Sequence, residues 1–399
     1  MANYQYMREL YKEQSVAQAN DELLSYISDG REYRNLDLGK LFTECFGWHE
    51  FDFCRRHPRP GEYSVHDVIT RGGAITEAEG AVSTVAFQNI VGQYLYSAVL
   101  DAYKDEDTVF MDLIPEVKTQ FLEGEKLPGI SQLGDEAAVR DEGEPYALAG
   151  VAEDWIFTPP VKDRGMQVNV TWESIFADRT GVLLQRCSDV GKWIKINREK
   201  RAVDCVIDEN TTAHRYSWRG LGAMASFSDN SGSHSFDNLV ASNPILDWSS
   251  LNAAEQVFNA ITDPYTGEEL EWEPTHLIVT KQNEQIARRI IRAGEIRVTT
   301  PGYATSANPT QTLVANPYSS KYTLVTSRRL ASRLATDTDW FLGNIGAYAK
   351  YMVAEPMMVL QAPSGNTDEF ERRIVAKFRA NERGAYVVVQ PRAMVKSTA

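Results

Sequence analysis

The sequence predicts an α+β chain in which helical segments surround a long two-stranded excursion. Three observations lead to this prediction. Apolar side chains recur at helical spacing in residues 1–30, 88–104 and 180–209, which predicts helices there. Strand-like segments at 119–122 and 155–171 enclose an acidic stretch that is rich in glycine. Helix-like and strand-like segments then alternate toward the C-terminus.

The length and composition indicate a folded chain of more than one module. With 399 residues, the chain exceeds the roughly 250–300 residues at which a single hydrophobic core stops growing. Hydrophobic residues make up 43% and charged residues 24%, which is ordinary for a globular protein. The 41 basic and 55 acidic residues give a net charge of −14, which excludes a protein that holds nucleic acid by neutralising its phosphates.

Neither a membrane span nor a secretion signal is expected. No stretch approaches the roughly 18–20 apolar residues that a transmembrane helix needs. The first residues also lack the basic-then-apolar order of a secretion signal. Four scattered cysteines are too few for a disulfide scaffold: Cys45, Cys54, Cys187 and Cys205. We therefore expect a protein made in a cytosol, with reduced thiols.

The segment 123–154 is the most unusual part of the chain. It contains nine acidic and two basic residues, so its local charge is 2 − 9 = −7. Its seven glycines and prolines forbid a long helix, and apolar residues such as Leu133 and Tyr146 are scattered through it. Compact domains rarely contain such a loop unless it has a role. We expect a two-stranded excursion whose irregular tip packs on a neighbour.

A long helix is predicted directly after the excursion. Leu183, Cys187, Val190 and Ile194 are spaced by four, three and four residues, and no proline interrupts residues 172–209. Thr180 is a suitable cap for its first turn. Gly191 should lower its stability slightly, because glycine is a poor helix former.

The C-terminal half is expected to be regular. The pattern predicts two helices, several short strands, a surface loop and a final hairpin with its turn at 381–384. The predicted segments are a helix at 251–261, a turn at 263–267, a strand at 277–279, a helix at 286–291 ended by Gly294, a loop at 299–320, strands at 323–326 and 351–360, and hairpin strands at 374–379 and 386–389.

Two motifs suggest chemistry, and we interpret both as accidental. Residues 220–225 match a dinucleotide-binding fingerprint, but no buried strand precedes them and no helix follows. Zinc-type ligands occur close together at Cys45, His49, Cys54 and His57, but their spacing fits no usual zinc site. No motif of a hydrolase, metalloprotease or phosphate-binding loop is present. We therefore predict no catalytic residue, no cofactor, no metal and no enzymatic activity.

The order of the segments, together with several short motifs, resembles the major capsid protein of tailed double-stranded DNA phages, which has the Hong Kong 97 phage capsid fold. Segments 124–134 and 142–146 resemble the extended loop of that family, and 170–173 with 178–181 resembles the entry to its long spine helix. The motifs of the C-terminal third are Asn316-Pro-Tyr318, Thr338-Asp-Trp-Phe-Leu-Gly343, Phe370-Glu-Arg-Arg-Ile-Val-Ala-Lys-Phe378 and Arg383-Gly384.

The resemblance implies a division of the chain into the parts of a capsid subunit. These would be an N-terminal arm at 1–79, peripheral-domain segments at 80–118, 166–209 and 351–399, an extended loop at 119–165, and an axial domain at 210–350. Copies would form pentamers and hexamers that close into an icosahedral virion shell around double-stranded DNA. That shell would be assembled in the host cytoplasm, with a portal protein and scaffold or decoration proteins as further partners.

Two other functions fit parts of the sequence. An encapsulin-type compartment would share the fold but enclose enzymes instead of a genome. An unrelated cytosolic hydrolase is an alternative of a different class.

The charges predict which residues make contacts in the assembly. The acidic tip contributes Asp141, Glu142 and Glu144, and it needs basic partners on an adjacent subunit. One candidate cluster is Arg198, Lys200 and Arg201 on the long helix. The other lies near the C-terminal hairpin, where strand alternation puts Arg373, Lys377 and Arg379 on one side as an exposed basic stripe.

Overall fold

The structure is a computed structural model that describes the larger part of the chain. The described residues are 6–7, 10, 16–30, 41, 45, 77–105, 107–128, 155–171, 182–209, 216–218, 222, 224–229, 236–263, 267, 269–270, 272–300, 310–361 and 374–398.

The chain divides into two compact units. Unit 1 comprises residues 1–107, 163–197 and 355–382, and unit 2 comprises residues 108–162, 198–354 and 383–399. Three of the five divisions fall within long elements, which are α9 (Val182–Ile207), β11 (Ala349–Gln361) and β12 (Ile374–Val388).

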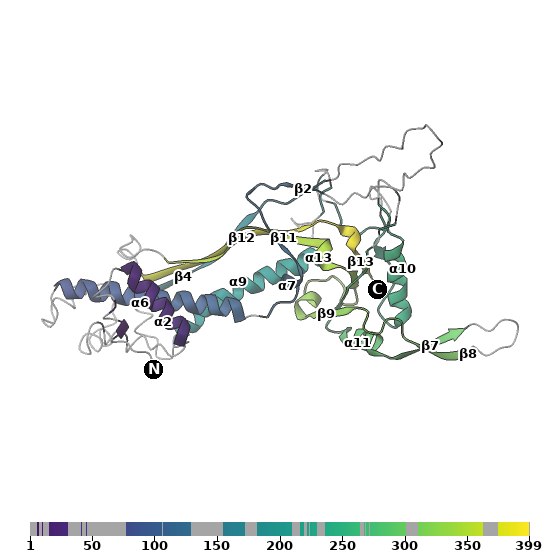
Figure 1. Ribbon diagram of the computed structural model, residues 1–399, viewed down its shortest axis with the longest axis horizontal. Coiled ribbons are helices and arrows are strands. Elements are labelled where there is room, and N and C mark those ends of the chain that lie inside the picture. The colour runs from purple at the N-terminus through teal and green to yellow at the C-terminus, as the bar shows by residue number, and fades with distance from the viewer. Residues whose placement is uncertain are drawn as a thin grey trace, which may run out of the picture. The chain divides into compact units, whose positions relative to one another are not determined.

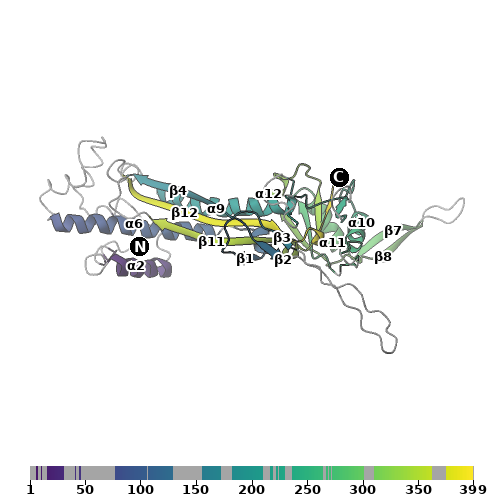
Figure 2. The same cartoon turned by 90° about the horizontal axis from the view of Figure 1, so that it is seen from above.

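Unit 1 packs long helices against one face of a sheet. It contains α2 (Val16–Gly30), α6 (Glu77–Asp105), β4 (Lys162–Thr171) and parts of α9, β11 and β12. Figure 2 shows that strand β12 lies between β11 and β4 and that α2 lies alongside α6. The core joins Val99 of α6, Val190 and Ile194 of α9, Val359 of β11 and Ala380 of β12.

Helices α6 and α9 approach each other closely at Gly191. A Cβ atom at this position would lie 2.1 Å from the carbonyl oxygen of Val99. Gly191 was predicted to lower the stability of the helix slightly. Because it has no side chain, it allows the backbones of α6 and α9 to come into contact.

Replacing Gly191 with alanine should destabilise the protein by about 1–3 kcal/mol, because the added methyl group overpacks the α6–α9 contact. Helix propensity alone predicts the opposite sign, a gain of about 1 kcal/mol. Urea unfolding of the variant decides between the two. Gly346→Ala in α13 (Ile345–Tyr348) is the matched control, since its nearest neighbour would be 3.6 Å away. A stabilised Gly191→Ala variant would show that the helices separate at little cost.

Unit 2 is built around a five-stranded sheet with a hydrophobic core on each face. The strand order is β5–β13–β10–β6–β9. Strand β10 is antiparallel to β13 and β6, whereas β9 is parallel to β6 and β5 is parallel to β13. The bounds are β5 (Leu239–Val240), β6 (His276–Thr280), β9 (Thr323–Ser327), β10 (Trp340–Gly343) and β13 (Met394–Ser397).

The residues of β10 alternate between the two cores, as expected for a strand that is buried on both faces. Trp340 and Leu342 pack with α10 (Trp248–Asn259) and α11 (Glu284–Arg292), whereas Phe341 packs with the C-terminal end of α9. Four short elements complete the unit: α7 (Phe110–Leu113), α12 (Arg328–Ala331), α13 and the 3₁₀ helix η2 (Pro391–Ala393).

Ion pairs link the C-terminal strand β13 to other residues of unit 2. The Lys396 ammonium lies 2.6 Å from a carboxylate oxygen of Glu209 and 3.4 Å from one of Asp339. Glu209 also accepts a hydrogen bond of 2.7 Å from the backbone N–H of Ala335.

Three smaller strand pairs extend the two sheets or stand apart from them. Strand β1 (Glu116–Lys118) runs parallel to β11, with Glu116 opposite Tyr351. Strands β2 (Lys126–Pro128) and β3 (Trp155–Phe157) form an antiparallel pair at the base of the excursion. Strands β7 (Glu295–Thr300) and β8 (Thr310–Ala315) form an antiparallel ribbon (Figure 1).

Most of the predicted elements are confirmed. The helices α2, α6, α9, α10 and α11 and the strands β3, β4, β6, β9 and β11 lie where the pattern placed them, although α6 begins at Glu77 rather than at residue 88. The turn after α10 is also present, because the N–H of Gly267 donates to the carbonyl oxygen of Asp263 at 2.9 Å. The predicted cap Thr180 lies outside the described residues.

Two predicted segments are wrong, one strand and one loop. The segment 119–122 is not a strand, and the first strand of the excursion is β2. The predicted surface loop at 299–320 contains most of the β7–β8 ribbon. Its threonines and prolines resemble a loop in composition, but the ribbon is stabilised by backbone pairing over six residue pairs.

The predicted C-terminal hairpin is also wrong, because β12 is one continuous strand from Ile374 to Val388. The expected turn at 381–384 therefore does not exist. Gly384 serves packing instead, since a Cβ atom there would lie 2.1 Å from the Tyr351 hydroxyl. Without a side chain at Gly384, the Tyr351 ring packs against Tyr386, with 4.4 Å between the ring centroids.

No helix in the described ranges is long and apolar enough to cross a membrane.

Candidate functional site

The structure describes two of the three residues of the predicted basic stripe, and both lie on the outer face of the unit 1 sheet. Along β12, Phe378 and Ala380 are buried, whereas Lys377 is half-buried and Arg379 is exposed. The expected alternation of this strand is therefore observed over residues 377–380. Arg373, the third member of the predicted stripe, lies outside the described residues.

Strand β11 adds apolar side chains to the same face. Val359 of β11 and Ala380 of β12 point into the core with α6 and α9. The residues between these inward positions lie on the opposite face of the sheet. They include Met358 and Leu360, whose side chains are 37% and 45% exposed. The outer face is thus both basic and apolar. Its apolar part follows from alternation within β11, a signal that is present in the sequence but was not part of the prediction.

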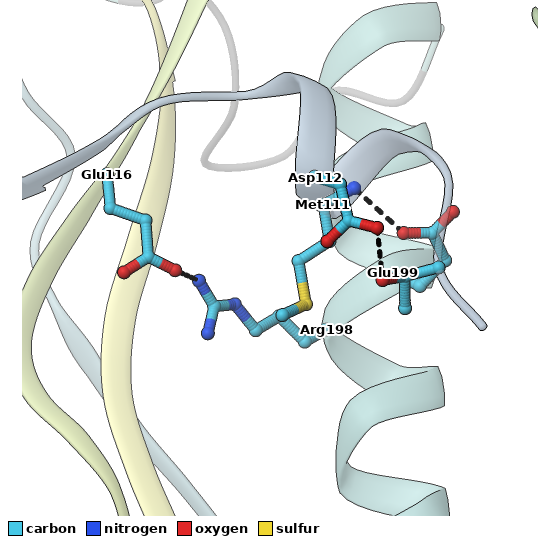
Figure 3. A network of polar contacts seen from close by, with 6 residues as sticks. Met111, Asp112, Glu116, Arg198 and Glu199 are labelled. Atoms are coloured by element: carbon cyan, nitrogen blue, oxygen red, sulfur yellow. Dashed lines mark hydrogen bonds and ion pairs between the residues drawn. The ribbon is translucent and has the colours of Figure 1, made fainter. Parts of the chain in front are cut away.

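The second predicted cluster is largely internal. Arg198 and Arg201 are buried, and Lys200 is half-buried. Arg198 forms an ion pair with Glu116 of β1, and its guanidinium lies 4.1 Å from the centroid of the Tyr351 ring. Figure 3 shows this side chain reaching from α9 toward Glu116. The charge of Arg198 is therefore used inside its own chain.

Glu199 reaches the short helix α7 on the other side of α9 (Figure 3). One carboxylate oxygen accepts hydrogen bonds from the backbone N–H groups of Val109 at 3.1 Å and Phe110 at 3.0 Å. The other accepts from the N–H of Met111 at 2.9 Å. Glu199 is completely buried, and the N-cap residue Val109 supplies no side-chain cap of its own. A residue distant in sequence thus caps α7.

The phenol of Tyr386 belongs to the same region of unit 2. Burial raises the pKa of Tyr386, while the positive charge of Arg198 acts in the opposite direction. Arg198 and Glu199 thus bind partners within their own chain, which is typical of a structural role.

The base of the acidic excursion is a well-defined strand pair. The N–H of Thr158 donates to the carbonyl of Glu125 at 2.9 Å, and the N–H of Glu125 donates to the Thr158 hydroxyl at 2.8 Å. Gly124 has φ = 106°, and a Cβ atom there would lie 2.3 Å from the carbonyl oxygen of Thr158. The predicted contact residues Asp141, Glu142 and Glu144 lie outside the described residues.

The structure describes some of the residues that were candidates for other chemistry. Cys45 and Cys205 are buried and form no disulfide. Burial raises the pKa of the Cys205 thiol well above its usual value, which makes it a poor nucleophile. Burial also lowers the pKa of His276 at the start of β6. Cys54, His49 and His57 of the zinc-like set lie outside the described residues, and the described part of the chain holds no cluster of three metal-binding side chains.

The chain was compared with known families, curated proteins and solved structures. A sequence profile of the family described as "Phage capsid protein" matches residues 157–397, which is more than half of the chain. No curated protein matches it.

Several solved structures match this chain at low identity. The capsid of the cyanophage P-SCSP1u is 12% identical, with a TM-score of 0.46, over 74% of this chain and 88% of that chain. A structure from Gordonia phage Cozz is 11% identical, with a TM-score of 0.43, over 74% of this chain and 88% of that chain. A virus-like particle from Pyrococcus furiosus is 11% identical, with a TM-score of 0.39, over 76% of this chain and 97% of that chain.

These findings confirm two predictions made from the sequence. The α+β class is seen directly in the helices and mixed sheets of both units. The profile match confirms the family that the short motifs suggested, and it favours neither an encapsulin shell nor a hydrolase. The chain is a structural component of a virion, and it belongs to the phage capsid protein family.

Proposed function

We propose that copies of this subunit form pentamers and hexamers that close into an icosahedral head around packaged double-stranded DNA. The protein would do so without catalysis, cofactor or metal. The observation that carries the proposal is complementarity between two surfaces of the chain. The excursion is acidic and dotted with apolar residues, whereas the outer face of the unit 1 sheet is basic and apolar.

The acidic composition supports the proposal that the shell encloses DNA without binding it tightly. A chain with a net charge of −14 repels phosphates overall, so an inner wall of such subunits would not adhere to the DNA that it encloses. The DNA would be held by the closed shell and not by sequence-specific contacts. A portal protein would be needed for DNA entry, and scaffold or decoration proteins would be further partners of the same shell.

The proposed role of each part of the chain follows the order of the segments in the sequence. In this proposal residues 1–79 form an arm, and 210–350 form the axial domain around the centre of each capsomer. Segments 80–118, 166–209 and 351–399 form the peripheral domain. The loop 119–165 extends over an adjacent subunit during assembly in the host cytoplasm.

The proposed contact joins Asp141, Glu142 and Glu144 of one copy to Arg373, Lys377 and Arg379 of the next. A single exposed ion pair contributes only about 0–1 kcal/mol. A closed shell repeats the contact in every subunit, so small contributions add up over the particle. Met358 and Leu360 would cover apolar residues of the same loop. Arg198 and Arg201 are buried, so of the helix cluster only the half-buried Lys200 could contribute from the surface.

Reversing the charge of the loop should impair assembly, and most strongly at low salt, where screening is weakest. The test variant is Glu142→Lys with Glu144→Lys, and the measurement is the yield of closed particles by electron microscopy and sedimentation. Adding Lys377→Glu and Arg379→Glu should restore part of the yield. The control is Glu269→Lys with Glu273→Lys, which changes the net charge equally at two exposed positions of unit 2.

Normal particle yield from the loop variant at low salt would contradict the electrostatic contact. A yield that falls equally in the control variant would show that only the net charge of the chain matters.

A further inference from the structure

The β7–β8 ribbon of unit 2 has apolar side chains that no described part of the unit covers fully. Figures 1 and 2 both show it extending away from α11 and the five-stranded sheet. A two-stranded ribbon is only marginally stable in water unless something covers it. Leu313 of β8 is nevertheless 65% exposed, and its neighbour Val314 is 47% exposed.

Both faces of the ribbon present apolar side chains. Residues that stand opposite each other on paired strands lie on the same face, and successive residues lie on opposite faces. Leu313 stands opposite Arg297, and Val314 stands opposite Ile296. Leu313 therefore lies on one face and Val314 on the other. A partner that covers a single face leaves an exposed apolar residue on the second.

The charges of the ribbon suit contact between identical segments. Glu295 and Arg297 are both exposed and lie two residues apart on the face of Leu313. Identical segments that carry a net charge repel one another, but this pair of charges sums to zero in a chain whose net charge is −14. The ribbon is thus a locally neutral, apolar surface on an acidic protein.

We infer that the ribbons of neighbouring copies stack on one another in a ring, the Leu313 face of each against the Val314 face of the next. The occupant of the surface is a second copy of this chain, and the inference rests on the proposed assembly into cyclic capsomers. A two-fold contact would pair like faces and leave the other two faces in water. A head-to-tail contact that closes into a ring covers both faces of every ribbon with one pair of surfaces.

Cysteine cross-linking distinguishes the two geometries. The background carries Cys54→Ser and Cys187→Ser, and the probes are Leu313→Cys and Val314→Cys in separate chains. Subunits of both kinds are assembled together and treated with a short bis-maleimide, which tolerates a larger gap than the roughly 4 Å between Cβ atoms of a disulfide. The readouts are linked dimers on a denaturing gel and particles by electron microscopy.

Stacking of unlike faces predicts linked dimers in the mixture and only traces when either variant is assembled alone. In an equal mixture about a quarter of the contacts join the two cysteines, which sets the expected amount of dimer. The control is Leu246→Cys, which is 62% exposed in the same unit but outside the ribbon, and it should not link to either probe.

The other outcomes overturn the inference in distinguishable ways. Dimers from either variant alone would indicate contact between like faces. Particles without any linked dimer would refute the ribbon contact and leave the proposed function intact. The absence of particles and rings from the cysteine background, under conditions where they are sought by microscopy, would overturn both.

Discussion

A subunit in which Asn-Gly replaces residues 129–154 should fold normally and fail to form closed shells. The excursion has a base that is complete without its tip, because Pro128 stands opposite Trp155 and the Glu125–Thr158 hydrogen bonds close the strand pair. A two-residue Asn-Gly turn joins such strands with a favourable twist. The replacement therefore removes the acidic and apolar tip while keeping β2 and β3.

The fold and the assembly are measured separately. Thermal unfolding of the variant should lie close to that of the unassembled parent, since no described core residue is removed. Electron microscopy should show capsomer-sized species and no closed shells. A second variant with a Gly/Ser linker of the original length should fail in the same way, because it restores the reach of the loop but not its charge or its apolar residues. Shells of normal size from either variant would refute the role of the loop.

Periodicity predicted the elements that a single local pattern determines. The helices α9, α10 and α11 and the buried strand β6 have apolar residues at a spacing that fits one structure only. The same reasoning failed where the local pattern and the tertiary context disagree. Asn381 and Gly384 are typical turn residues, yet they lie within β12, because Gly384 makes room for the Tyr351 ring. Nothing in the sequence near 384 indicates a tyrosine thirty-three positions earlier.

Part of the candidate site could be predicted, because a local pattern determines the positions of its residues. Alternation along β12 placed Lys377 and Arg379 on the outer face, because the buried Phe378 fixes the register of the strand. The fate of Arg198 could not be predicted from its neighbours. Its partners Glu116 and Tyr351 come from β1 and β11, which approach α9 only in the folded unit 2. A basic residue on a helix is usually exposed, and only the tertiary structure shows that this one is buried.

Glu199→Ala should be the most destabilising single substitution among the polar residues of this network. It removes the acceptor of three backbone N–H groups at the start of α7, and both Glu199 and Phe110 are completely buried. A buried donor left without a partner costs about 1–3 kcal/mol, and hydrogen bonds to a charged acceptor are at the upper end of this range. Because the three losses are coupled, we expect a total of about 3–5 kcal/mol.

Glu199→Gln separates the loss of charge from the loss of the acceptor. The amide oxygen can still accept from two N–H groups, but the amide nitrogen faces a third donor and cannot accept. We expect a loss of about 1–3 kcal/mol, so the order of stability is wild type, Gln, Ala. The neighbouring Arg198–Glu116 pair is left in place by both variants, so any change reports on the cap of α7.

Urea unfolding of unassembled subunits, followed by tryptophan fluorescence at one protein concentration, measures these differences without the stabilisation that assembly adds. Glu269→Ala is the control, because an exposed carboxylate without such acceptor bonds should change the stability by less than about 0.5 kcal/mol. If Glu199→Ala and Glu269→Ala unfold at the same urea concentration, α7 is not held by Glu199. If Gln is as damaging as Ala, the negative charge and not the number of acceptor bonds determines the stability of this helix cap.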